Sequence, residues 1–180
     1  MRLSLLLLLL VPAAFAAEKK YNFRTDFSLS RYVDGPRLSP PMQKDKALLL
    51  FFWAYELESP SGGEALKFFQ KLADEHKEDM LVVGVENVGM AGTNKNISAV
   101  MKKAGLTFSM YSGCRSPFKT TTYPYVCIFD REGKLIYNAV PKTEPFMEAI
   151  EKAVAKPDGK DGKAEPKKDD KPKPDPKKAA

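Results

Sequence analysis

The clearest pattern in the chain is a continuous apolar run that stops at a turn and gives way to a helical repeat. Leu48–Trp53 contains no polar residue, which is typical of a strand buried on both faces. After a short loop, one helical stripe carries Leu66, Phe69, Leu72, Ala73 and His76. The pattern predicts a buried strand, a loop and an amphipathic helix.

Two helix starts compete within one turn of this loop. Ser61, followed three residues later by Glu64, forms a capping box, whereas Ser59 before Pro60 offers an N-cap with proline in the first turn. We favour Ser61 because Gly62 and Gly63 are weak helix formers that are best tolerated at a helix end.

The rest of the chain continues the alternation of strands and helices. Leu81–Val85 predicts a second buried strand, parallel to the first and joined to it by a right-handed crossover. We expect a loop at 87–96, a helix at 97–104, a short extended segment at 106–110 and a polar loop at 111–122 that carries Cys114. Strands at 125–129 and 134–138 flank a turn, and Thr143 or Glu144 opens a last helix.

The stretch FFWA, a loop and the amphipathic helix resemble thioredoxin-like proteins, in particular secreted thiol-disulfide oxidoreductases and peroxiredoxin-like proteins. Their matching stretch reads FWATWCxxC, and Trp53 and Ala54 of this chain fit it. The two family cysteines then fall on Leu57 and Pro60. Neither side chain can supply a thiolate, so the resemblance implies a fold that has kept the site without its redox chemistry.

A second resemblance lies in TYPYVCIFDREGKLIY, which is similar to the family segment that contains a cis-proline facing the cysteine loop. Pro124 takes that position. In the family, the backbone of the preceding residue, here Tyr123, pairs with an extended substrate chain. The segment DFSLSRYVDGPRL resembles the family's entry hairpin.

These resemblances imply an α/β, thioredoxin-like three-layer fold over residues 17–155. We expect a central mixed sheet, helices on both faces and an N-terminal hairpin extension. Residues 1–16 read as a secretory signal, with Leu3–Val11 as its apolar core and Ala14-Phe15-Ala16 as the cleavage motif. The sequence therefore predicts a periplasmic or secreted protein with no integral membrane segment after cleavage.

The charge of +6 is not concentrated on the predicted domain. Residues 17–155 carry a net charge of +2, and residues 156–180 carry +3. A nearly balanced domain does not favour a nucleic acid partner. The Lys/Pro/Asp-rich tail lacks aromatic and branched aliphatic residues, so we expect it to be disordered and at most a weak tether to the cell envelope.

Cys114 and Cys127, thirteen positions apart, are the only cysteines of the chain, and His76 is its only histidine. This set suits neither a CxxC motif nor a metal site, and no cofactor is predicted. Cys127 lies within a predicted strand, which favours a buried inert thiol. A Cys114–Cys127 disulfide is the alternative, because an exposed unpaired thiol is a liability outside the cell.

The favoured function is a binding module for a peptide or protein that lacks the redox cysteine pair. Its predicted contact surface comprises Tyr55, Glu56, Leu57, Glu58, Ser59, Pro60, Tyr123 and Pro124. For Trp53 and Tyr125 we favour core packing. The alternative function is a thiol-disulfide oxidoreductase or peroxidase that uses Cys114 or Cys127 in an atypical arrangement.

Overall fold

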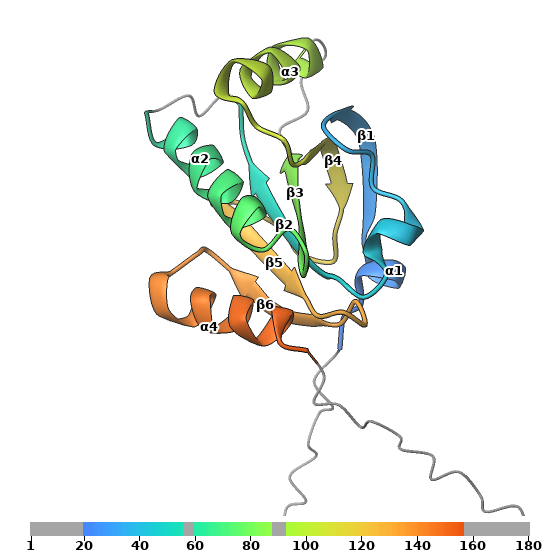
Figure 1. The fold of residues 1–180 in the computed structure, drawn as a ribbon. Coiled ribbons are helices and arrows are strands. Elements are labelled where there is room, and N and C mark those ends of the chain that lie inside the picture. Colours follow the sequence, from blue (N-terminus) through green and yellow to red (C-terminus); the bar gives the residue numbers. More distant parts are fainter. Residues whose placement is uncertain (1–19, 56–59, 88–92, 157–180) are drawn as a thin grey trace, which may run out of the picture.

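The computed structural model describes residues 20–55, 60–87 and 93–156 (Figure 1). Within these ranges, six strands form one mixed sheet in the order β1-β4-β3-β2-β5-β6. The strands are β1 (Ser28–Asp34), β2 (Ala47–Trp53), β3 (Met80–Glu86), β4 (Ser109–Arg115), β5 (Tyr125–Phe129) and β6 (Leu135–Ala139). The helices are α1 (Phe23–Asp26), the 3-10 helix η1 (Pro40–Gln43), α2 (Pro60–Glu75), α3 (Thr93–Ala104) and α4 (Thr143–Val154).

The central strand β2 has the environment that its apolar sequence predicts. It pairs in parallel with β3 and antiparallel with β5, and all seven of its residues are buried. Strands β3 and β4 are also parallel. The predicted β-α-β order and the α/β class with a mixed sheet are therefore confirmed.

The two faces of the sheet are covered unequally. On one face, the first hydrophobic cluster joins alternate residues of β2 to the buried stripes of α2, α3 and α4, and the rings of Phe51 and Phe69 stack with centroids 4.0 Å apart. The second cluster, on the opposite face, contains Phe23 of the one-turn helix α1 together with Leu38 and Phe118 from connecting segments. Long helices thus cover one face, and one helical turn and loops cover the other (Figure 1).

The start of the chain corrects the expected hairpin. Strand β1 does not pair with a neighbouring N-terminal strand but adds antiparallel to β4 at the edge of the main sheet, with Leu29 opposite Cys114 and Tyr32 opposite Tyr111. Before it, Asn22 accepts a hydrogen bond from the backbone of Arg24 at 2.9 Å and caps α1. The position of β1 in the sheet therefore depends on pairing with β4, a strand far away in the sequence, and no local sequence pattern predicts that pairing.

Two further boundaries differ from the sequence prediction. Helix α2 begins at Pro60 rather than after Ser61, which agrees with the habit of proline to occupy the first helical turn. Residues 111–115, expected in a polar loop, belong to β4. Their small polar residues have little tendency to form a strand. They are held in β4 by backbone pairing with β1 on one side and β3 on the other.

Arg131, in the turn between β5 and β6, ties three separate segments together. Its guanidinium donates to the backbone carbonyl of Asp45, to Asp79 Oδ1 at 2.7 Å and to the carbonyl of Val154 at 2.6 Å. Lys46 beside it donates to the carbonyl of Lys77 at 2.6 Å. These contacts fasten the end of α4 and the starts of β2 and β3 to the β5–β6 turn.

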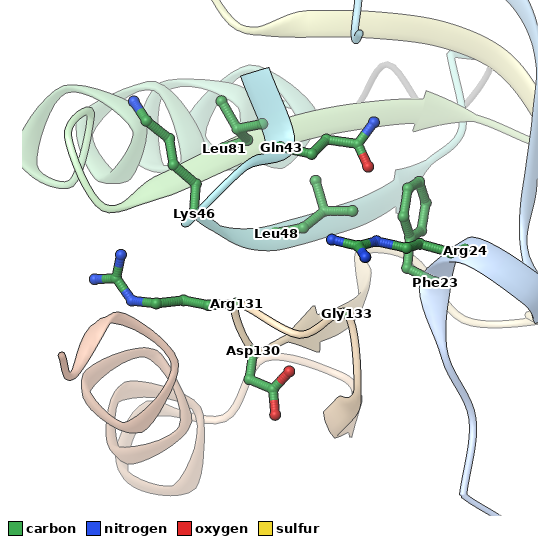
Figure 2. Close-up of a pocket in the computed structure, with 9 residues that line it drawn as sticks. All are labelled: Phe23, Arg24, Gln43, Lys46, Leu48, Leu81, Asp130, Arg131 and Gly133. Atoms are coloured by element: carbon green, nitrogen blue, oxygen red, sulfur yellow. The ribbon is translucent and has the colours of Figure 1, made fainter. Parts of the chain in front are cut away.

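Figure 2 shows the narrow cleft beside this contact network, where Arg131 and Lys46 lie on one side and Phe23 with Arg24 on the other. Its free volume is about 10 Å³, which is of the order of a single water molecule. The cleft is therefore a packing seam between elements and too small to be a ligand site.

Gly84 in β3 gives a test of the packing between the sheet and α2. A Cβ placed there would lie 2.7 Å from Met110 Cε and 2.8 Å from Phe51 Cζ, and Phe51 is held by its stack on Phe69. We expect Gly84→Ala to lower the free energy of unfolding by about 1–3 kcal/mol because it overpacks the core. Chemical denaturation measures this change.

Gly63→Ala is the matched control, because Gly63 lies in α2 and a Cβ there has no neighbour within 4 Å. We expect this variant to be as stable as the wild type or more stable by up to about 1 kcal/mol. Equal stability of the Gly84→Ala and Gly63→Ala variants would contradict the packing described here.

The Arg131 network also predicts an acid dependence of stability. The hydrogen bond from Arg131 holds the pKa of Asp79 below its ordinary value of 3.8. A carboxyl whose pKa is lower in the folded state stabilises the fold above its unfolded pKa and loses this contribution as pH falls through the folded pKa. Asp79→Asn should therefore be less stable than the wild type at neutral pH, and the difference should shrink below about pH 4. Denaturation curves from neutral to acid pH test this, and a difference that does not change with pH would refute it.

Candidate functional site

The candidate site lies at the edge of the sheet where β2 and β3 end and β5 begins. Because β5 runs antiparallel to β2, its first residue, Tyr125, lies opposite Phe52 near the carboxyl end of β2. Trp53, the last residue of β2, lies opposite Glu86, the last residue of β3. Segments far apart in sequence therefore converge on one edge.

The peptide bond between Tyr123 and Pro124 is cis, as the resemblance implied. The hydroxyl of Tyr123 accepts a hydrogen bond from Asn87 Nδ2 at 3.3 Å and donates to the carbonyl of Thr120 at 3.4 Å. The backbone N–H of Asn87 in turn donates to the carbonyl of Trp53 at 3.1 Å. Asn87 thus links the segment before β5 to the ends of β2 and β3.

Trp53 is part of the core, as predicted. It is 8% exposed, and its Nε1 donates to Met110 Sδ at 3.3 Å. The ring of Tyr55 lies 6.3 Å from the Trp53 ring and packs against the first cluster. Tyr123 packs against the second cluster, so Tyr55 and Tyr123 approach the same edge from opposite faces of the sheet.

Tyr125 is half-buried, and its ring lies 6.3 Å from that of Phe52. Burial raises the pKa of its hydroxyl. These observations agree with the packing role favoured for Tyr125 from the sequence.

The predicted residues Glu56, Leu57, Glu58 and Ser59 lie outside the described residues. Pro60 is the first residue of α2, and only its backbone belongs to the described part of the structure. The described part of the predicted surface therefore consists of Tyr55, Tyr123 and Pro124, and the contribution of the remaining loop stays a prediction.

Sequence reasoning missed Glu86 and Asn87 as members of this edge. Glu86 is 1% exposed although it is ionisable, and Asn87 anchors Tyr123 as described above. Both follow the apolar run of β3 directly. Polar residues just beyond the carboxyl end of a buried parallel strand are a usable signal, because ligand sites of open α/β sheets lie there.

The chain was compared with known proteins. No protein-family model and no curated protein sequence matches it. Among solved structures, it is similar to a thiol-disulfide isomerase from Corynebacterium glutamicum, with 14% identity, a TM-score of 0.56, and coverage of 72% of this chain and 94% of that one. The chain has a thioredoxin-like fold.

Two other solved structures share this thioredoxin-like fold. A thiol:disulfide interchange protein of the thioredoxin family from Chlorobium tepidum has 15% identity and a TM-score of 0.56, over 78% of this chain and all of that one. StoA from Bacillus subtilis has 20% identity and a TM-score of 0.51, over 69% of this chain and 96% of that one. At these identities, the likeness concerns the fold.

Within the thioredoxin-like fold, the cysteines of this chain do not form a CxxC pair. Cys114 lies on β4 and Cys127 on β5, and both thiols are free. Strands β3 and β2 lie between them, so three strand spacings of about 4.8 Å separate them across the sheet. A disulfide needs Cα atoms within about 7 Å, and the Cys114–Cys127 disulfide considered from the sequence is therefore wrong for this fold.

Both thiols are also poor nucleophiles where they lie. Burial raises the pKa of Cys114 to about 11 and that of Cys127 to about 12. Cys127 is fully buried, as predicted, and Cys114 is half-buried. Since the thiolate is the reactive form, each is almost entirely in its unreactive form near neutral pH.

Neither a metal cluster nor a membrane span was found in the described part of the chain. No three His, Cys, Asp or Glu side chains gather there as a metal would require. None of the helices in residues 20–55, 60–87 and 93–156 is long and apolar enough to cross a bilayer.

The placement of the thiols predicts their reactivity. In the native protein near pH 7.5, we expect both cysteines to be alkylated at least about 100-fold more slowly than in the urea-unfolded chain, because burial limits access and raises both pKa values. Mass spectrometry of trapped samples measures the rates, and Cys114→Ser assigns the remaining signal to Cys127. Native alkylation of either thiol at the unfolded rate would contradict this description and revive the oxidoreductase alternative.

Proposed function

We propose that this protein is an exported, non-catalytic binding module that holds an extended peptide or protein segment at the Tyr123–Pro124 edge. The observation that carries the proposal is the anchoring of Tyr123, whose hydroxyl is engaged by Asn87 and Thr120. These contacts, of 3.3 and 3.4 Å, orient its ring at the end of the sheet beside the cis peptide bond.

The backbone of Tyr123 supplies the means of binding. Among the described residues, no hydrogen bond engages its N–H or its carbonyl. An extended chain can pair with such groups by strand addition, in which backbone hydrogen bonds provide affinity and side-chain contacts provide specificity. Orientation of the tyrosine before binding reduces the entropy lost when the partner binds.

Tyr55 and Leu57 are the proposed side-chain contacts on the other side of this edge. The Tyr55 ring is partly buried against the first cluster, so it is positioned without being wholly removed from the surface. Tyrosines that combine an apolar ring with a polar tip are enriched where proteins meet. Glu56, Glu58, Ser59 and Pro60 complete the proposed surface.

A thiol-based activity has no support from the site. The edge described above contains no cysteine, and burial raises the pKa of both thiols. Export rests on the signal predicted at 1–16, which lies outside the described residues, as does the proposed envelope tether beyond residue 156.

Binding to an array of extended peptides tests the function. We expect the wild-type protein to bind a subset of sequences and Tyr123→Asp to weaken this binding at least about 10-fold, because a charged residue replaces an aromatic contact worth more than about 1.4 kcal/mol. Tyr55→Asp should act in the same direction. Titration of the best peptides by fluorescence anisotropy provides the affinities.

Met147→Asp is the control variant, because Met147 is 40% exposed on α4, which contributes no residue to the proposed surface, and the substitution introduces the same charge. It should bind like the wild type. Circular dichroism establishes that each variant is folded before its affinity is interpreted. Absence of binding to any peptide, or equal affinities of the Tyr123→Asp and Met147→Asp variants, would refute the proposed function.

A further inference from the structure

Two large apolar side chains are exposed on the outer surface of α2 and α4. Phe68 of α2 is 42% exposed and Met147 of α4 is 40% exposed. The Phe68 ring lies 6.1 Å from the ring of Phe146, which directly precedes Met147 in α4. The two exposed side chains therefore come from two helices that meet on the same side of the sheet (Figure 1).

The core beneath these helices is already filled by other side chains. Phe146 is 1% exposed, and Phe69, which follows Phe68 in the sequence, is completely buried. Both belong to the first hydrophobic cluster. Single exposed apolar side chains are normal, whereas apolar side chains gathered on one surface with a polar rim mark an interaction site.

The rim around these two side chains is formed by carboxylates. Glu144 and Glu151 stand three residues before and four residues after Met147. Glu64 stands four residues before Phe68. Residues at these spacings are neighbours on a helix surface. All three glutamates are exposed, and none forms an ion pair within the described ranges. We call these five side chains the Phe68–Met147 surface.

The lysines of the two helices do not cancel this negative charge. Lys71 pairs with Glu75 of its own helix at 3.6 Å, and Lys67 and Lys152 are the remaining lysines. The net charge is −1 over α2 and −2 over α4, although residues 17–155 together carry +2. The Phe68–Met147 surface therefore lies on the acidic part of a domain whose remainder is basic.

We propose that the Phe68–Met147 surface binds a cationic amphipathic helix of a partner protein. Phe68 and Met147 contact the apolar face of that helix, and its lysine or arginine side chains lie against the three glutamates. Recognition of a helix in this way relies on apolar anchors at helical spacing. Opposite charges at the rim accelerate association and exclude acidic partners.

The charge of the surface argues against two other occupants. A second copy of this chain would bring two identical acidic surfaces together across a two-fold axis. The negatively charged surface of a membrane would meet the same carboxylates. Both arrangements place like charges against one another, which costs free energy. This inference does not depend on peptide binding at the Tyr123–Pro124 edge.

Titration of the full chain with two designed peptides tests the proposal. The first is a fluorescent peptide of leucine and lysine, about 16 residues long, with leucine at helical spacing. In the second, glutamate replaces every lysine. We expect the lysine peptide to bind at least about 10-fold more tightly than the glutamate peptide. This difference should shrink at about 0.5 M salt because the charges are then screened.

Variants of the surface assign the binding to its residues. Phe68→Ser should weaken binding of the lysine peptide at least about 5-fold, because it removes an apolar anchor. The double variant Glu144→Gln/Glu151→Gln should weaken it at least about 5-fold at low ionic strength. Glu132→Gln is the matched control, since it removes the same charge from an exposed position in the turn between β5 and β6, and it should bind like the wild type.

The glutamine variants keep the test informative if Phe68→Ser does not fold, because they change only exposed side chains. Circular dichroism checks the fold of each variant. Equal affinities of the double glutamine variant and Glu132→Gln, or equal affinities of the wild type for the two peptides, would overturn the proposal. Self-association of the wild type in sedimentation velocity that Phe68→Ser abolishes would also overturn it, because a second copy would then be the occupant.

The two proposed binding sites can fail independently. Tyr123→Asp, which should weaken binding of extended peptides, should bind the lysine peptide like the wild type. Phe68→Ser should in turn bind the extended peptides like the wild type, because Phe68 is not part of the Tyr123–Pro124 edge. Loss of lysine peptide binding in Tyr123→Asp but not in Phe68→Ser would place that peptide at the edge and refute this inference alone.

Discussion

Complete burial of β2 is the constraint on which the other elements depend. All seven of its residues are removed from water, so apolar groups must cover both faces of the sheet, and strands must satisfy its backbone on both sides. The stack of Phe69 on Phe51 fixes α2 over one face. The aromatic side chains of Phe23, Phe27 and Phe118 close the other without a long helix.

The same constraint sets the position of the candidate site. The strand must leave the core at Trp53, and its neighbour β5 enters the sheet beside it in the opposite direction. The loops that follow β2 and β3 and the loop that precedes β5 therefore meet at one edge. Trp53 is held inside by Met110, whereas Tyr55 and Tyr123 approach this edge without being wholly buried. The fold thus separates the residues that are buried in the core at this edge from those that keep part of their side chain at the surface.

The parts of the fold that the sequence predicts are those with a local pattern. The runs of β2 and β3 and the stripes of α2 and α4 show their burial directly, and the location of Tyr123 and Pro124 followed from a resemblance. The pairing of β1 with β4 could not be predicted from the sequence. Ser112, Gly113 and Cys114 do not have the apolar or β-branched side chains typical of strands, and their backbone pairs with residues far away in the sequence. Asn87 was missed for a similar reason, since its role is visible only when Tyr123, 36 positions away, is placed beside it.

This chain has the same fold as the thiol-disulfide proteins to which it is similar, but its cysteines lie in positions that do not favour a reactive thiol. A reactive thiol requires a neighbour that stabilises the thiolate and access for a disulfide partner. Cys127 has neither, because it is enclosed in the second cluster, and Cys114 lies half-buried at the pairing of β4 with β1. Burial at both positions favours the protonated form. The thiols therefore act as small apolar side chains that fill the face of the sheet that no long helix covers.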